Sequence, residues 1–273
     1  MKKGRISTII LIVLLLAGLA LILYPTVSDY WNSLHQSKAI TEYAEQVADL
    51  DNTRYAQLWQ AAEQYNQALR TKANRFTMSE EEQAEYESQL NVSESGAIGY
   101  IEIPTINCSL PIYHGTDDAV LQRAVGHIAG TSLPVGGEST HCVISGHRGL
   151  PSARLFTDLD RLTVGDRFLL RVLDETLTYE VDQIRIVLPY EMDDLEIVEG
   201  KDYCTLVTCT PYGVNSHRLL VRGHRVDNET EATTVCVTAD AMQIEPVIVA
   251  PLVALPILLV LLVLLLLPKR RKK

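Results

Sequence analysis

Thr205-Leu-Val-Thr-Cys-Thr-Pro-Tyr-Gly-Val-Asn-Ser-His-Arg-Leu-Leu-Val-Arg-Gly-His-Arg225 is the stretch of sequence that decides the fold of this chain. The residues from Cys204 to Thr208 are β-formers and predict a strand. Pro211 ends that strand, because proline cannot donate a hydrogen bond to a ladder. Turn residues follow, and the apolar run from Leu219 to Val221 leads back. The pattern predicts a hairpin with a loop of about six residues.

Cys209 and Arg218 come side by side if this hairpin forms. The thiol then lies at a strand end, next to a guanidinium that cannot lose its charge. A thiolate needs such a neighbour, and so does the oxyanion that it creates on an acyl carbon. The alternative is that Cys209 is a small buried hydrophobic residue, which is the usual state of a free cysteine. The turn and the arginine favour a nucleophile.

Short β runs also precede the hairpin. They are expected at residues 97–103, 108–113, 141–147, 168–173 and 177–188. Short helices are expected at Asp117–Ala124 and at Ser152–Leu159, the second with Ser152 as its cap. Together with the hairpin this makes seven or eight strands and few helices, which indicates a mainly β fold and a closed or nearly closed barrel.

A helical region precedes the strands. Apolar residues recur at spacings of three and four from Ser28 to Thr71, and Asp51-Asn52-Thr53 predicts a break between two helices. Ser79 and Glu82 have the spacing of a capping box and predict a short third helix. We expect this region to be a helical stalk that packs one stripe on the following domain.

Both ends of the chain are apolar. Ile6–Tyr24 and Val247–Leu267 are each about as long as the ~20 residues that cross a bilayer, and basic residues flank both runs on their outer sides. This predicts two membrane spans, with both termini in the cytoplasm and residues 25–246 outside. A cleaved signal peptide is the competing interpretation of the first run, but Leu23-Tyr-Pro25 offers no small-residue cleavage site.

Charge excludes nucleic acid as an expected partner. All 34 acidic residues lie between the two basic tails, which hold eight of the 24 Lys and Arg, so the outside portion is strongly acidic.

Cysteines occur at 108, 142, 204, 209 and 236. Cys204 and Cys209 lie on opposite faces of one predicted strand and cannot form a disulfide. We expect no structural zinc and no structural disulfide.

The stretch around Cys209 resembles the nucleophile signature of the sortases, and its long form is similar to the class C, pilin-polymerising branch. The likeness runs from about Tyr65 to Arg225. Ser145-Gly-His147-Arg-Gly-Leu-Pro151 resembles the sortase histidine motif, and its glycines let substrate and backbone approach closely. The resemblance implies a closed eight-stranded β-barrel with short helices.

The resemblance also implies a transpeptidation without metal or organic cofactor. Cys209 attacks the Thr–Gly carbonyl of a Leu-Pro-X-Thr-Gly-like sorting signal, His147 protonates the leaving amine, and Arg218 steadies the oxyanion or the substrate backbone. A second amine resolves the thioester, and in class C enzymes it comes from a pilin lysine. The implied partners are pilin or surface-protein sorting signals, an amine acceptor and the membrane.

In class C sortases a lid bearing Asp-Pro and an aromatic residue covers the active cleft. The corresponding residues here are Asn74-Arg75-Phe76, with the aromatic present and the Asp-Pro absent. Phe76 is therefore a lid candidate, with ordinary surface packing as the alternative. The missing aspartate motivates the hypothesis that the cleft is more open than is usual for the class.

Other histidines and arginines receive lesser roles. We interpret His127 and His141 as structural, Arg148 as a weaker candidate for substrate contact, and Arg222 and Arg225 as surface charges or ion-pair partners. The alternative functions are a wall-anchoring sortase with a peptidoglycan amine as acceptor, a cysteine peptidase that uses water, and an inactive membrane-tethered binding domain.

The expected organisation follows from these assignments. It comprises a basic tail at 1–5, a span at 6–24, a helical stalk and lid-like segment at 25–95, a catalytic barrel at 96–228, a linker at 229–246, a span at 247–267 and a basic tail at 268–273.

Overall fold

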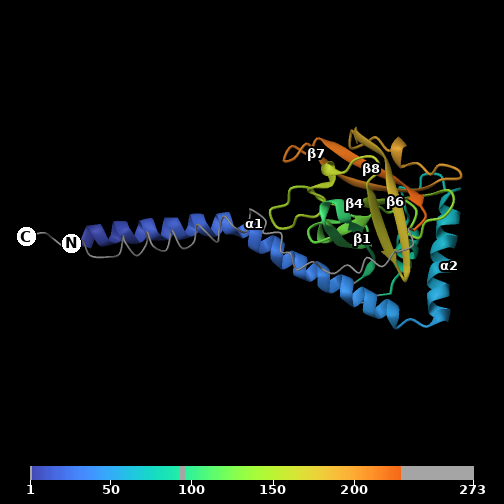
Figure 1. Ribbon diagram of the computed structural model, residues 1–273, viewed down its shortest axis with the longest axis horizontal. Coiled ribbons are helices and arrows are strands. Elements are labelled where there is room, and N and C mark those ends of the chain that lie inside the picture. Colours follow the sequence, from blue (N-terminus) through green and yellow to red (C-terminus); the bar gives the residue numbers. More distant parts are fainter. Residues whose placement is uncertain (1, 93–95, 229–273) are drawn as a thin grey trace, which may run out of the picture. The chain divides into compact units, whose positions relative to one another are not determined.

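The computed structural model describes residues 2–92 and 96–228, and β-strands are the main regular structure of the part after residue 96 (Figure 1). The helices are α1 (Lys2–Ala48), α2 (Asn52–Leu69), α3 (Glu80–Ser88), α4 (Asp118–Leu121) and three 3-10 turns, η1 (Pro104–Ile106), η2 (Leu159–Arg161) and η3 (Asp193–Leu195). The strands are β1 (Ala97–Ile103), β2 (Cys108–His114), β3 (Val125–His127), β4 (Thr140–Ser145), β5 (Arg167–Val172), β6 (Glu175–Val187), β7 (Asp202–Thr210) and β8 (His217–Val226).

The eight strands close into a barrel in the order β1-β2-β3-β4-β7-β8-β6-β5. The pairs β2–β3 and β4–β7 are parallel, and the other neighbours are antiparallel. The expected closed eight-stranded barrel is confirmed. Its three-residue strand β3 was not foreseen from the sequence, because Val-Gly-His is too short to show an alternating pattern.

Two helices begin where their capping residues predict. Asp51 caps α2, since its Oδ1 accepts a hydrogen bond from the backbone N of Arg54 at 2.7 Å, which confirms the expected break between α1 and α2. Ser79 and Glu82 form the predicted capping box at the start of α3.

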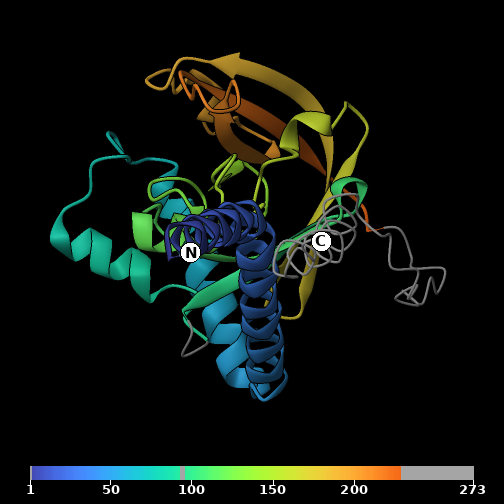
Figure 2. The same ribbon diagram turned by 90° about the vertical axis from the view of Figure 1, so that its left-hand side faces the viewer.

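The part of α1 that follows Tyr30 packs on the barrel, and so does α2. The buried Tyr43 hydroxyl donates to the carbonyl of Ile98 at 3.1 Å and accepts from the backbone N of Leu173 at 2.7 Å. Asn66 of α2 exchanges two hydrogen bonds with the backbone of Leu133, at 2.7 and 3.1 Å. In Figures 1 and 2, α2 turns back from the end of α1 and runs alongside the barrel. The helical region is thus docked on the barrel by buried polar contacts.

The part of α1 up to Tyr30 belongs to a different unit from the barrel, whose unit begins at Trp31. Within the described residues one helical segment, Ile10–Ala48, includes a stretch long and apolar enough to cross a membrane, a property that an anchor and a signal sequence share. The second predicted span, Val247–Leu267, lies outside the described residues.

Two apolar clusters occupy opposite sides of the barrel wall. The larger fills the interior, and along β7 it takes Cys204 and Leu206. The smaller lies on the outer face, where it takes Val207. Successive side chains of a strand point to opposite faces, so Cys209 shares the outer face with Val207. The smaller, outer cluster consists of Val143, Val187, Leu195, Val207 and Leu220.

One predicted helix is wrong. Residues Ser152–Leu159 form turns, and a single 3-10 turn follows at η2. Leu155 has φ at 38°, in the left-handed region that a right-handed helix cannot continue through, and its side chain is buried. Ser152 does not cap a helix there; its carbonyl accepts a hydrogen bond from Asn32 Nδ2 of α1 at 2.7 Å. The strand expected at 141–147 also ends earlier, at Ser145.

Candidate active site

Cys209 and Arg218 are register partners across the antiparallel β7–β8 pair. Strand β7 ends at Thr210 and β8 begins at His217, so the loop between them has the predicted length of about six residues. This confirms the expected geometry of the hairpin. Both residues are partly exposed, and the thiol lies at the end of its strand, where a substrate can reach it.

His147 lies two residues beyond β4, on the other side of β7. The two strands are parallel, with Ser145 as the partner of Val207. Beyond the last partners, the backbone N of Gly146 donates to the carbonyl of Val207 at 3.0 Å, and Thr208 Oγ1 donates to the carbonyl of Gly146 at 2.7 Å. His147 follows Gly146 directly, so these contacts hold the histidine segment beside Val207 and Thr208, the two residues before Cys209.

A fourth residue belongs to the same row. Val187, the last residue of β6, is the register partner of Arg218 on the side away from Cys209. The row of register partners therefore runs from Cys209 through Arg218 to Val187, with the segment that carries His147 next to it on the β4 side. Sequence reasoning missed Val187, because no local pattern shows that β6 pairs with β8.

Arg148 ties the histidine segment to the end of β7. Its guanidinium forms an ion pair with Asp160 of η2, donates to Thr210 Oγ1 at 3.4 Å and lies 5.9 Å from the ring centroid of Tyr212. The side chain is only 10% exposed. These contacts tie the segment that carries His147 to the end of β7 and to η2, and the predicted substrate contact of Arg148 stays a prediction.

The glycines beside His147 serve internal packing. A Cβ on Gly146 would lie 2.7 Å from Cδ2 of Phe156. Gly149 has φ at 75°, and its Cβ would lie 2.8 Å from Cε2 of Tyr212. The side chains of Phe156 and Tyr212 thus lie where a side chain at position 146 or 149 would point.

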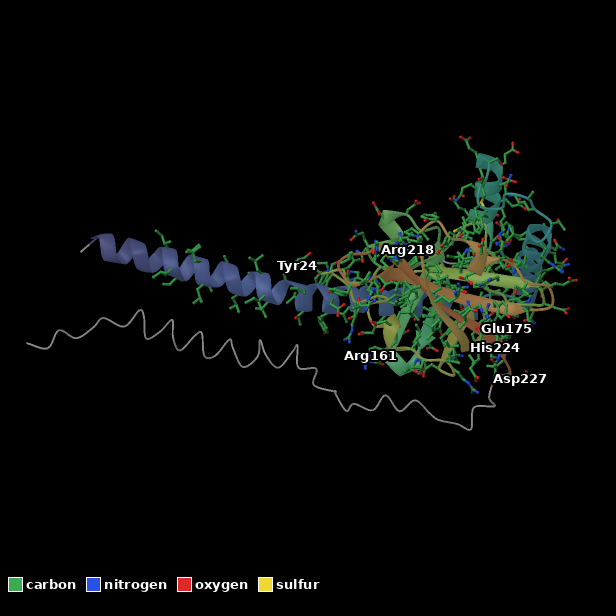
Figure 3. The ribbon with its side chains drawn as sticks, turned by 90° about the horizontal axis from the view of Figure 1, so that it is seen from above. Tyr24, Arg161, Glu175, Arg218, His224 and Asp227 are labelled. Atoms are coloured by element: carbon green, nitrogen blue, oxygen red, sulfur yellow. The ribbon has the colours of Figure 1, made fainter. Side chains whose placement is uncertain are left out.

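Arg218 keeps its charge available. Its Nη1 donates to the carbonyls of Asn215 and His217 at 3.3 and 3.1 Å, and among residues 2–92 and 96–228 no carboxylate forms an ion pair with it. Arg222, four residues along the same strand, is held by both oxygens of Asp182 at 2.9 and 3.0 Å, so its predicted role as an ion-pair partner is confirmed. Figure 3 shows Arg218 near one end of the barrel, with His224 of the same strand well away from it.

The other described cysteines lie in different surroundings. Cys142 and Cys204 are register partners on β4 and β7, and both are buried among the residues of the barrel interior. Burial raises the pKa of the Cys204 thiol well above its usual range and that of Cys108 to about 12. Neither group is prepared to be a thiolate. Cys236 lies outside the described residues.

His127 and His141 are buried framework residues, as the sequence predicted. The His127 ring lies between the Tyr86 hydroxyl, 2.8 Å from Nδ1, and the carbonyl of Ser132, 2.8 Å from Nε2. His141 Nδ1 lies 2.8 Å from the carbonyl of Glu196, and burial lowers its pKa to about 4. Both rings are used for holding the fold.

The lid candidate Phe76 is 37% exposed, and the guanidinium of Arg75 lies 4.8 Å from its ring centroid. Arg75 itself is buried, and its hydrogen bonds go to Leu195 and Glu196 near η3. None of these bonds reaches Cys209. No group of three or more His, Cys, Asp or Glu in the described part of the chain is placed to hold a metal ion.

Known proteins share this arrangement of strands and sequence. A family model described as the sortase domain matches residues 101–226. The chain is 32% identical over 156 residues to sortase D of Bacillus subtilis, a match that covers 55% of this chain and 74% of that protein.

Solved structures are similar over more of the chain. Sortase C1 of Streptococcus agalactiae has 54% sequence identity and a TM-score of 0.69, over 70% of this chain and 100% of that one. Sortase C of Streptococcus pneumoniae, whose structure was described in terms of catalysis and pilin substrate specificity, has 43% identity and a TM-score of 0.62, over 70% of this chain and 97% of that one. The neighbours are class C sortases, which agrees with the branch indicated by the Cys209 stretch.

Proposed function

From the premise that this chain belongs to the sortase family and is a cysteine transpeptidase, we propose that Cys209 is its nucleophile, with His147 and Arg218 as partners. The observation that carries the proposal is the pairing of Cys209 with Arg218, and the contacts of Gly146 with Val207 and Thr208 support the place of His147 beside them. A thiol, an imidazole and an unpaired guanidinium are the groups that cysteine acyl transfer requires.

The reaction follows from the chemistry of these groups. The Cys209 thiolate attacks the Thr–Gly carbonyl of a Leu-Pro-X-Thr-Gly-like sorting signal, and Arg218 donates to the oxyanion. The C–N bond breaks as the His147 imidazolium gives its proton to the leaving glycine amine, which leaves a thioester. An acceptor amine then attacks the thioester, forms an amide and releases the thiol. No step needs a metal or an organic cofactor.

We assign the acceptor as a pilin lysine, which makes the chain a pilus-assembly enzyme. Support comes from the class C neighbours, one of which was described in terms of pilin substrate specificity. A peptidoglycan amine is the second candidate, which would make the chain a wall-anchoring sortase.

We also propose that the enzyme is anchored in the cell membrane by two spans, with both termini cytoplasmic and the barrel outside. The apolar helical segment within α1 supports the first span. The basic residues that flank the apolar runs at 6–24 and 247–267 support the topology.

An adduct-trapping experiment tests the nucleophile. The full chain in detergent is mixed with a sorting-signal peptide, quenched in acid and measured by intact mass, beside Cys209→Ala. We expect the acyl mass on the wild type and not on the variant. An adduct on both proteins, or on neither, contradicts the assignment. Adding a pilin domain with its lysine, or a peptidoglycan-like amine, then identifies the acceptor by the product formed.

A further inference from the structure

The segment between α2 and α3, residues 70–79, crosses the outside of the barrel as a strap that is fastened at Arg75. The Arg75 side chain is 8% exposed, and its Nη2 donates to the carbonyl of Leu195 at 2.9 Å and to Oε2 of Glu196 at 3.0 Å. A charged group that is buried this far needs such partners, because an unpaired buried charge is costly. Arg75 therefore links the strap to the β6–β7 connection, residues 188–201.

Two further contacts hold the strap, one with the β3–β4 connection and one with α3. A Cβ on Gly130 would lie 2.4 Å from the carbonyl oxygen of Arg75, so the backbone of the strap presses on the β3–β4 connection. Lys72 forms an ion pair with Glu82 of α3 at 2.6 Å, which fastens the strap on its other side. Elsewhere the strap and residues 196–199 line a common cavity of about 680 Å³. The ion pair between Arg75 and Glu196 thus joins the strap to the β6–β7 connection.

Glu196 is held from the barrel side as well. Its carbonyl oxygen lies 2.8 Å from His141 Nδ1, which must carry the proton because a carbonyl only accepts. His141 Nε2 in turn lies 2.7 Å from Thr205 Oγ1 on β7. Arg75 and His141 therefore hold the middle of the β6–β7 connection from opposite sides.

This connection borders the row of candidate catalytic residues. It leaves β6 at Val187, the partner of Arg218, and its Leu195 enters the outer apolar cluster. In that cluster Val207 and Leu220 are register partners, each two residues from Cys209 or Arg218 on its own strand. A displacement of Leu195 would therefore alter the wall beside the thiol.

The polar contacts of Arg75 do not reach the thiol. Cys209 is partly exposed, and the polar contacts of Arg75 end at Leu195 and Glu196. Arg218 contacts only backbone carbonyls of its own hairpin among the hydrogen bonds of the described residues. The residue where class C lids carry proline is used here to hold the β6–β7 connection.

We propose that Arg75 is a positioning residue for substrate binding, which holds the β6–β7 connection through Leu195 and Glu196 as the wall against which the apolar part of the sorting signal binds. The inference rests on the proposed function. It differs from a lid, because it requires the strap to stay in place while the enzyme works.

The test compares Arg75→Met with Lys72→Met in the full chain in detergent. Both variants remove one strap cation and keep an unbranched side chain, but only the first frees the β6–β7 connection. We expect Arg75→Met to raise KM for a sorting-signal peptide about ten-fold with kcat within two-fold, and Arg75→Lys to recover part of the loss. Lys72→Met leaves both constants unchanged. A fall in melting temperature alone, with unchanged KM, overturns the proposal.

Two further measurements keep this test separate from the proposed function. Peptide affinity is measured in Cys209→Ala with and without Arg75→Met. If Cys209→Ala binds no peptide, the proposed function fails, and the inference fails with it. If Cys209→Ala binds the peptide equally well with arginine and with methionine at position 75, only the inference fails. The rate at which iodoacetamide labels Cys209 is compared in the wild type and in Arg75→Met. A many-fold faster reaction in Arg75→Met would show that the strap covers the thiol and would overturn the inference.

Discussion

Arg218 lies directly opposite Cys209 in the β7–β8 ladder and, unlike Arg222 on the same strand, forms no ion pair among the described residues. A guanidinium that is paired with a carboxylate has its donors occupied, whereas the hydrogen bonds of Arg218 among the described residues go to two backbone carbonyls. The closeness of a thiol and an available cation is the feature on which the proposed chemistry depends.

Arg218→Lys is expected to lower kcat/KM for a sorting-signal peptide by about 100-fold, since one donor to an oxyanion is worth roughly that factor. Lysine keeps the charge but loses the planar fork of donors. Arg222→Lys is the matched control on the same strand, held by Asp182, and should change kcat/KM less than three-fold. Equal losses in the two variants would show that Arg218 acts only through the stability of the hairpin.

Native alkylation should distinguish the cysteines. Iodoacetamide at neutral pH is expected to modify Cys209 within minutes, while Cys142 and Cys204 stay unmodified until the protein unfolds, because both are buried in the barrel. Peptide mapping by mass spectrometry gives the extent at each site. Cys204→Ala should still form the acyl adduct, whereas Cys209→Ala should not. Rapid labelling of Cys204 in the folded protein would contradict the structure.

The local parts of this fold could be read from the sequence, and the long-range parts could not. The hairpin around Cys209 and the caps at Asp51 and Ser79 depend on residues within about ten positions, and the structure has them as expected. The pairing of β6 with β8, which places Val187 beside Arg218, joins strands that no periodicity connects. The same holds for the outer apolar cluster.

The wrong prediction at Ser152–Leu159 has a physical cause. Ser152 suits a helix cap, but Leu155 is buried with a left-handed backbone, which a right-handed helix cannot contain. Tertiary packing outweighs the weak helix preference of a short segment. Likewise, the sequence showed that Asn74-Arg75 departs from the class C lid, but not that Arg75 binds Glu196, which lies 121 residues away.

Arg148 and Asp160 should act on the reaction as one unit. Arg148→Ala frees the segment that carries His147 from Thr210 and from η2, and we expect kcat to fall about ten-fold, within the losses that slight misplacement of a catalytic group causes. Asp160→Asn should have a similar effect. In the double variant the losses should not add, since each single change removes the same contact. Additive losses would mean that the two residues act separately.

Stability should fall on mild acidification because of buried neutral histidines. Burial lowers the pKa of His141 to about 4, below the value of about 6.5 of an unfolded histidine. Between these values the unfolded chain binds a proton that the folded chain does not, so the free energy of unfolding falls as pH drops through this window. For His141 the loss amounts to at most about 3 kcal/mol, because each pKa unit corresponds to about 1.4 kcal/mol.

Thermal melts at pH 7, 5.5 and 4.5 give the measurement, with His141→Gln as the comparison. The variant should be less stable than the wild type at pH 7, because it loses the ring that joins Glu196 to Thr205. Its stability should then fall less between pH 7 and 4.5, because the titrating group is gone. Other ionisable groups contribute equally to both proteins and cancel in the comparison. An identical pH dependence in the two proteins would place the acid sensitivity elsewhere, with His114, whose pKa burial also lowers to about 4, as the next residue to replace.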